Sequence, residues 1–408
     1  MSRAATERMW VEWNIALKFL SEARAQTLLI VVGIAVGTSV IVFITALITG
    51  LQANLIERTL GTQAHVKVEP PLEINRVIAQ PAATAHLVLE DQRAQRLRSI
   101  LSWQQVASAL EQLPEVTAVS PVVAGPAFAM RGAAVESVAL LGIDPQRYQR
   151  IIPVADYLVA GSLRVGAGDA VIGRRLAADL GLGVGDKLRL EAGDGRDAIV
   201  NVAGIFELGV SELDARYVYL DLKQAQSLLD LPGGVTVIDV TVRDIFAADT
   251  AAAGIARLTG LRAESWIVTN AQLVNGLRSQ SLSTVMISVF VAISVAFGIA
   301  SVLGVSVVQR TREIGILRAM GSPRRQVLRV FLIQGAVLGL AGSAVGAAAG
   351  YGLVWMFNNL GPGLFPIPVA PVLIPGAVAL ATVVGVLAAA APARRASGLD
   401  PVEAMRHV

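Results

Sequence analysis

The sequence contains no cysteine and only three histidines among its 408 residues. A chain without a thiol forms no disulfide, builds no thiolate metal site and performs no thiol catalysis. His65, His86 and His407 are far apart in the sequence, which indicates isolated polar side chains rather than a metal cluster. We therefore expect neither a metal site nor a catalytic site built on these residue types.

Charged residues are also scarce. They make up 16% of the chain, whereas hydrophobic residues make up 54%, and a typical soluble domain has about 25% charged residues. This composition favours a membrane protein. The net charge is only +3, which argues against nucleic acid or another polyanion as a partner.

Long runs of the sequence carry no charge at all. Residues 25–56, 281–308 and 330–393 contain no charged side chain, and about 20 apolar residues are enough to cross a bilayer. The last run is too long for one helix, and a stretch rich in Asn, Gly and Pro at 358–371 interrupts it with a short loop. We predict four transmembrane helices, at residues 25–50, 281–308, 330–357 and 372–391.

Residues 51–280 have the composition of a globular domain. Short β-rich runs such as Ala64–Val68, Ser137–Ile143 and Val235–Val242 alternate with helical runs between turn signals. The predicted fold class is therefore an α-helical membrane protein with four transmembrane helices and a large α+β domain between helices 1 and 2. The polar stretch Pro70–Arg98 within it is predicted to be a loop.

Residues 1–24 are predicted to form a helix at the membrane surface. Met9, Trp13, Leu17 and Leu20 follow helical spacing and share one face. Tryptophan is suited to the interface, where its ring is buried and its N–H group stays hydrated. An ordinary solvent-exposed helix is the alternative interpretation.

The distribution of basic residues indicates the orientation. Outside the domain at 51–280, they lie in residues 1–24, in the loop 309–329 and in the tail 392–408, and they are absent from the loop 358–371. Short loops rich in Lys and Arg stay in the cytoplasm. We therefore predict that both termini and the basic loop are cytoplasmic and that the domain at 51–280 is extracytoplasmic.

The stretch Gln309–Phe331 contains six arginines and one acidic residue, Glu313. We predict a short helix at Thr311–Met320, with Gly321 directly after its C-terminal end. Ser322 is predicted to cap the helix that follows. The result is a short helix, a sharp corner and a membrane helix.

Apolar residues recur along this short helix. Ile314, Leu317 and Met320 are expected to form an apolar knob beside Arg312 and Arg318. We interpret the knob as a contact for a partner protein, because a cytoplasmic loop with only a structural role needs no such surface. The alternative is that the knob lies on the membrane surface.

Five glycines recur at spacings of four, three, four and four residues in the third predicted membrane helix. At these spacings they form one stripe, which lets another helix approach to backbone distance. The alternative is a chance placement that faces lipid. The stripe consists of Gly335, Gly339, Gly342, Gly346 and Gly350.

Two motifs carry a family resemblance. Thr311-Arg-Glu-Ile-Gly-Ile-Leu-Arg-Ala-Met-Gly-Ser, followed by Arg325-Gln-Val, resembles the signature loop of FtsX-like ABC permeases, also called the MacB or type VII group. The closing Pro392-Ala-Arg-Arg-Ala-Ser-Gly-Leu-Asp-Pro-Val-Glu-Ala-Met-Arg resembles the C-terminal motif of that family. The order of the predicted elements matches as well.

Shorter motifs point to one branch of this family. Leu60-Gly-Thr-Gln-Ala-His-Val-Lys-Val resembles the lipoprotein-releasing permeases LolC and LolE, and so do Gly142-Ile-Asp-Pro and Tyr157-Leu-Val-Ala-Gly. Pro70–Arg98 departs from the compact form of the domain. No motif matches the chaperone-docking hairpin of that branch.

The resemblance implies a non-enzymatic membrane subunit of an ATP-driven complex in the bacterial inner membrane. It implies a separate cytoplasmic ABC ATPase that carries ATP and magnesium, so that this chain itself binds no cofactor. It also implies a second permease copy or paralogue, a periplasmic chaperone or adaptor, and an outer domain with a porter-like lobe and a small β lobe. The residues expected to couple to the ATPase are Arg312, Glu313, Ile314, Leu317, Arg318, Met320 and Gly321.

Several functions remain open at this point. The chain could extract or export a lipoprotein or another amphiphile by mechanotransmission, export a drug, lipid or glycolipid, or transmit a signal to periplasmic partners without transport. The predicted helices contain no charge, which argues against a proton-coupled carrier or an ion channel. A membrane-bound enzyme would have the carboxylates of Asp144, Asp156, Asp169 and Asp214 available, but they form no recognisable catalytic pattern.

Overall fold

The computed structural model describes residues 3–71, 97–361, 363 and 365–398. Most of the predicted loop Pro70–Arg98 and the end of the tail 392–408 lie outside the described residues. The chain divides into two compact units. One comprises Met1–Ile56 with Asn275–Val408, and the other comprises Glu57–Val274.

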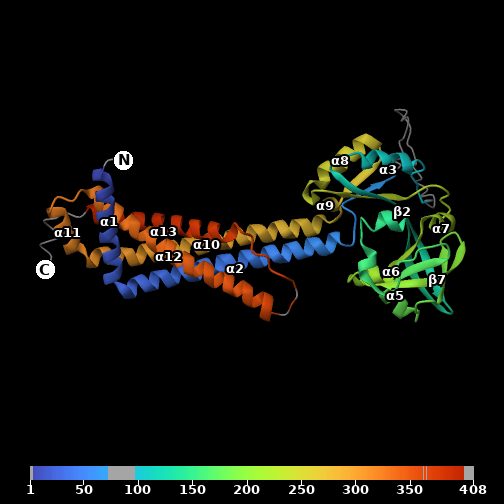
Figure 1. The fold of residues 1–408 in the computed structure, drawn as a ribbon, viewed down its shortest axis with the longest axis horizontal. Coiled ribbons are helices and arrows are strands. Elements are labelled where there is room, and N and C mark those ends of the chain that lie inside the picture. Colours follow the sequence, from blue (N-terminus) through green and yellow to red (C-terminus); the bar gives the residue numbers. More distant parts are fainter. Residues whose placement is uncertain (1–2, 72–96, 362, 364, 399–408) are drawn as a thin grey trace, which may run out of the picture. The chain divides into compact units, whose positions relative to one another are not determined.

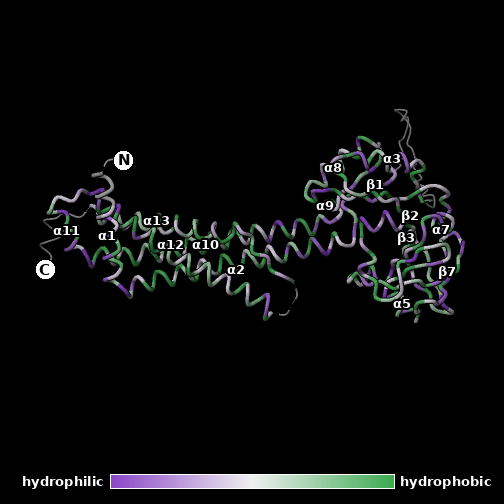
Figure 2. Tube along the Cα trace, viewed as in Figure 1, coloured by the Kyte–Doolittle hydropathy of each residue, from purple (hydrophilic) through white to green (hydrophobic). Residues whose placement is uncertain are grey.

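The first unit is helical. In the part of the chain that the structure describes, four of its helices are long and apolar enough to span a membrane, and Figure 2 shows hydrophobic residues along all four. They are α2 (Arg24–Leu60), α10 (Ala271–Gln309), α12 (Arg324–Leu360) and α13 (Leu373–Gly398). Two shorter helices, α1 (Arg3–Glu22) and α11 (Thr311–Ala319), complete the unit, and Figure 1 shows α1 crossing the long helices at the end where α11 lies.

The long helices continue past the predicted membrane spans. Charged residues such as Glu57 and Arg278 end the apolar runs, but the backbone of α2 and α10 stays helical beyond them. Loss of hydrophobicity ends a membrane span without ending a helix, since nothing in these segments breaks the backbone hydrogen bonds. The compact unit begins at Glu57 and ends at Val274, so it is shorter at both ends than the domain predicted at residues 51–280.

Small residues hold the long helices together. A Cβ atom added to Gly335 would lie 2.6 Å from the carbonyl oxygen of Gly385 in α13, and one added to Gly339 would lie 2.9 Å from the Cα of Thr382. One added to Gly346 would lie 2.4 Å from the carbonyl oxygen of Ala35 in α2. The glycine stripe therefore contacts two helices: its first two members face α13, and Gly342, Gly346 and Gly350 face α2.

Within its described residues, the second unit is built on one mixed sheet of ten strands. Their order is β10-β1-β9-β2-β3-β8-β5-β7-β4, and β6 pairs with β2 and β7. The strands are β1 (Val66–Glu69), β2 (Val116–Arg131), β3 (Ala134–Ile143), β4 (Leu158–Gly161), β5 (Asp169–Gly173), β6 (Lys187–Ala192), β7 (Asp197–Phe206), β8 (Tyr217–Asp221), β9 (Val237–Val242) and β10 (Arg262–Ser265).

Strand β2 lies in the middle of this order and pairs with three strands. Its first half pairs with β9, and its second half pairs with β6, while β3 runs along it from Val122 onward. Short helices occupy connections between the strands, and α9 follows the last strand (Figure 1). They are α3 (Trp103–Glu111), α4 (Pro145–Tyr148), α5 (Arg174–Asp179), α6 (Ser211–Arg216), α7 (Leu222–Leu228), α8 (Ala248–Thr259) and α9 (Trp266–Thr269), with short 3-10 turns at Val154–Tyr157 and Ile245–Ala247.

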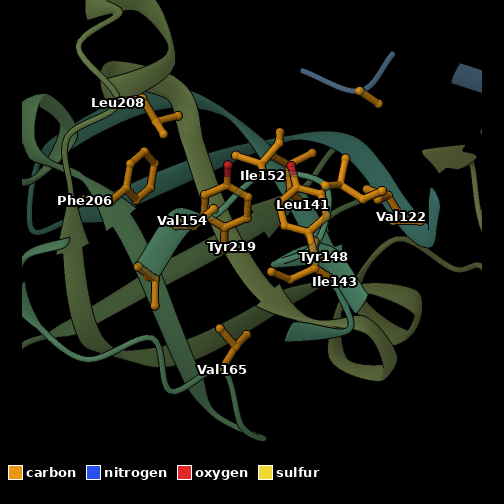
Figure 3. Packing of buried hydrophobic residues seen from close by; sticks show 14 residues of the cluster. Val122, Leu141, Ile143, Tyr148, Ile152, Val154, Val165, Phe206, Leu208 and Tyr219 are labelled. Atoms are coloured by element: carbon orange, nitrogen blue, oxygen red, sulfur yellow. The ribbon is translucent and has the colours of Figure 1, made fainter. Parts of the chain in front are cut away.

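Aromatic rings fill one core of this unit. The ring centroid of Tyr219 lies 5.7 Å from that of Tyr148 and 5.2 Å from that of Phe206. All three side chains are buried among aliphatic residues (Figure 3). Such tilted aromatic pairs add stability beyond the area that they bury.

Candidate coupling site

The short helix α11 ends in a defined corner. Gly321 has a φ of +96°, a conformation that favours glycine. Its N–H group donates to the carbonyl of Arg318 at 3.0 Å, and the N–H group of Ser322 donates to the carbonyl of Leu317 at 3.2 Å. These two bonds form a Schellman motif, so the predicted position of Gly321 after the helix end is confirmed.

The prediction that Ser322 caps the next helix is wrong. The N-cap of α12 is Pro323, and no side chain of the described residues caps that end of the helix. Ser322 is one residue too early, because its N–H group still belongs to the corner that closes α11. The capping preference of serine is local, whereas the corner has already fixed the backbone there.

The prediction of an exposed knob is wrong for Ile314. Its side chain is only 1% exposed and packs with Val307, Val327 and Phe331, and with Ala393 and Ala396 of α13. Leu317 is half-buried and lines a small pocket with residues of α1. Helical spacing placed Ile314, Leu317 and Met320 on one face, but the structure divides that face: Ile314 is buried, Leu317 is half-buried and Met320 is exposed.

The opposite side of α11 is open. Ile316 is 43% exposed and Met320 is 71% exposed, and Arg312, Glu313 and Ala319 are exposed beside them. We call these five residues the outer face of α11. It combines apolar side chains with both signs of charge, which suits contact with another protein.

Arg310 is the residue that the sequence analysis missed. It occupies the single position between α10 and α11, and its side chain is only 10% exposed. Its Nη1 lies 3.0 Å from Glu22 Oε2 and 3.4 Å from Glu313 Oε2, and its Nη2 donates to the Phe19 carbonyl at 3.0 Å. The guanidinium carbon also lies 4.5 Å from the centre of the Phe19 ring.

A second ion pair joins α1 to the bundle. Arg329 Nη1 of α12 lies 3.6 Å from Glu12 Oε1, and the side chain of Glu12 is only 6% exposed. Gln26 of α2 also donates to the side-chain oxygen of Gln309 at 2.8 Å. Polar contacts therefore connect α1, α2 and α12 to the corner around α11.

Of the four carboxylates considered for an enzyme, three make hydrogen bonds or ion pairs within the fold, and the fourth is exposed on the surface. Asp144 caps α4 by accepting from the N–H groups of two residues of that helix. Asp214 accepts from the N–H groups of Leu208 and Gly209 at 2.7 and 3.2 Å. Asp169 pairs with Arg164 at 3.1 Å, and Asp156 is exposed.

Known proteins resemble the chain over most of its length. The model of the MacB-like periplasmic core domain matches residues 27–258, which is more than half of the chain, and the model of the FtsX-like permease C-terminal matches residues 285–401. The lipoprotein-releasing system transmembrane protein LolC of Xylella fastidiosa is 25% identical, and the match covers 92% of each chain.

A second relative is longer than this chain. The macrolide export ATP-binding/permease protein MacB of Shewanella oneidensis is 27% identical over 98% of this chain, which spans 61% of the length of that relative. Among solved structures, the periplasmic region of MacB from Actinobacillus actinomycetemcomitans has a TM-score of 0.36 at 13% identity, covering 54% of this chain and 96% of the other.

The two family models account for both units. The core-domain match contains the ten-stranded sheet up to β9, and the permease match contains most of α10, the corner around α11, and α12 and α13. The motif at Thr311 lies inside the permease match, and the motif at Pro392 begins inside it and continues past its end at residue 401. The chain belongs to the family of FtsX-like ABC permeases with a MacB-like periplasmic core domain and is a multi-pass membrane protein.

Proposed function

We propose that this chain is the permease subunit of an ATP-driven complex in the bacterial inner membrane. Both termini and α11 lie in the cytoplasm, and the unit Glu57–Val274 lies in the periplasm. The arginines around α11 support this orientation, because short basic loops stay in the cytoplasm. Large domains are translocated largely regardless of their charge.

ATP is hydrolysed on a separate cytoplasmic chain that docks on the outer face of α11. The observation that carries this proposal is the exposure of Ile316 and Met320 on a helix that is fixed at both ends to membrane helices. Force applied there passes directly into α10 and α12. The LolC relative, which matches over nearly its whole length, is named as a transmembrane protein of a larger system, which favours a separate ATPase.

The proposed cargo is a lipoprotein or another amphiphile that the complex extracts from the inner membrane. The name of the LolC relative supports this choice. Two permease chains pair around the cargo, and a periplasmic chaperone or adaptor receives it. Export of a drug is the second candidate, because the MacB relative is named as a macrolide exporter and its match covers 98% of this chain.

Substitution of the outer face tests the docking. Ile316→Asp places a charge in the proposed contact, and we expect the ATPase to be lost when the permease is purified from membranes. The matched control is Ile199→Asp, because Ile199 is 64% exposed on β7 of the other unit. An ATPase that co-purifies equally with both variants would refute docking on this face.

Depletion of the chain tests the cargo. If the complex extracts lipoproteins, depletion leaves them in the inner membrane, and fractionation of the two membranes measures this. Normal lipoprotein release together with increased sensitivity to macrolides would favour the second candidate. Normal release without any change in drug sensitivity would favour signal transmission to periplasmic partners.

A further inference from the structure

Helix α1 has two contrasting faces. Trp10, Trp13 and Leu17 are 68, 46 and 39% exposed, and their spacing places them on one side of the helix. On the other side, Ala16 is fully buried and Glu12 is 4% exposed. An apolar face rich in tryptophan suits the membrane surface. We therefore expect the exposed face of α1 to contact lipid while its other face contacts the segment around α11.

The inward face of α1 is held by charge as well as by packing. Arg310 bonds to the Glu22 carboxylate and to the Phe19 carbonyl, both near the C-terminal end of α1. Its guanidinium lies over the Phe19 ring. A planar guanidinium makes all these contacts at once, which a lysine ammonium cannot do.

The same guanidinium also reaches α11. Glu313 lies in the first turn of α11, and its carboxylate is 3.4 Å from Arg310 Nη1. Among the residues that the structure describes, no side chain caps the N-terminal end of α11. The direction in which α11 leaves α10 is therefore set by the contacts of Arg310 and by the packing of Ile314 beneath the helix.

We propose that Arg310 is a positioning residue that locks the coupling helix α11 to the surface helix α1. The two short helices then move as one body, and a push on α11 is shared between α10, α12 and the membrane surface. The inference rests on the proposed function, because it assigns to α11 the role of receiving that push. Arg310 does not touch the ATPase, since its side chain is 90% covered by this chain itself.

The absence of cysteine makes a direct test possible. Spin labels on Lys18→Cys and Met320→Cys, both at exposed positions, report the distance between α1 and α11 in the full chain reconstituted in lipid vesicles. We expect one narrow distance distribution with Arg310 present and a broad one in Arg310→Gln. The matched control is Arg324→Gln, because Arg324 is exposed in the same corner, and it should keep the narrow distribution.

Coupling is measured next on the purified complex with its ATPase. Arg310→Gln should retain the bound ATPase. The change in ATPase activity that the permease causes should fall roughly fivefold or more, which is the lower end of typical coupling between sites. A double variant, Glu22→Cys with Arg310→Cys, should show the same loss. A short bifunctional thiol reagent that joins the two cysteines should restore the response, which separates a positional role from misfolding.

The outcomes distinguish the two proposals. A narrow distance distribution in Arg310→Gln overturns the lock, whatever the ATPase does. Loss of coupling that cross-linking fails to restore in a correctly inserted chain also overturns it. Suppose that the distribution is broad in Arg310→Gln and narrow in the parent chain, but that no ATPase binds to the parent chain. This result refutes the proposed function and leaves the lock between α1 and α11 intact.

Discussion

Asp239 shows what burial does to a single charge. It lies on β9, opposite Lys67 of β1 and Ser120 of β2. It is 6% exposed, and its Oδ1 atom has no hydrogen-bond partner among the described residues. Burial raises the pKa of Asp239 from 3.8 to about 6, although the nearby Lys67 acts in the opposite direction.

The raised pKa predicts how stability depends on pH. Between about pH 4 and pH 6 the folded chain binds more protons at Asp239 than the unfolded chain, so the stability of this unit falls as the pH rises through that window. Asp239→Asn removes this dependence. At pH 7 we expect Asp239→Asn to be more stable by up to about 3 kcal/mol, because each pKa unit corresponds to about 1.4 kcal/mol.

Thermal unfolding of the purified chain at pH 4 and pH 7 measures this effect. The matched control is Asp156→Asn, because Asp156 is exposed in the same unit. A stability difference between Asp239→Asn and the parent chain that is the same at both pH values would contradict the role assigned to Asp239.

At the scale of elements, α12 shows how closely helices approach through glycine. An alanine at position 346 would bring its Cβ atom to 2.4 Å from the Ala35 carbonyl oxygen, so α2 and α12 must separate. We expect Gly346→Ala to destabilise the helical unit by about 1–3 kcal/mol, the usual cost of overpacking. Gly352→Ala is the control on the same helix, since nothing lies within 4 Å of the added Cβ atom.

The melting temperature of each variant in detergent measures this cost. Gly352→Ala should match the parent chain or melt slightly higher, because alanine favours the helix more than glycine does. Equal melting temperatures for the two alanine variants would show that the glycine contact with α2 does not hold the bundle together.

The sequence predicted the elements better than it predicted their contacts. Long apolar runs and the glycine period are local patterns, so four apolar helices and the stripe were visible before the structure. The burial of Ile314 and the role of Arg310 depend on α13 and α1, which are distant in sequence. The position of the cap at Pro323 depends on the corner that closes α11. Arg310 is one of six arginines in this stretch, and nothing in the sequence distinguished it as the buried one.

The strands show the same limit. The β-rich runs Ala64–Val68, Ser137–Ile143 and Val235–Val242 predicted β1, β3 and β9, because apolar residues recur in each between turn signals. The full length of β2 was not predicted, since Pro121 and Pro126 interrupt its pattern. Pro121 lies in the part of β2 that pairs with β9, and Pro126 lies in the part that pairs with β3 before β6 joins. A proline is tolerated in a strand where its position does not have to donate to a neighbouring strand.

At the scale of the whole molecule, composition and architecture agree. The hydrophobic residues are concentrated in one helical unit, and the charges return in a second unit with its own sheet and core. Of the two units, only the helical one contains the outer face of α11. Coupling by mechanotransmission requires that this face and the unit Glu57–Val274 lie on opposite sides of the membrane.

Cysteine labelling tests that requirement, because the parent chain has no cysteine and gives no background. Asp194→Cys lies in an exposed turn before β7, and Ala319→Cys lies on the outer face of α11. In intact spheroplasts, a membrane-impermeant maleimide should label Asp194→Cys but should label Ala319→Cys only after the membrane is permeabilised. Labelling of Ala319→Cys in intact spheroplasts would show the opposite orientation, in which a cytoplasmic ATPase could not reach α11.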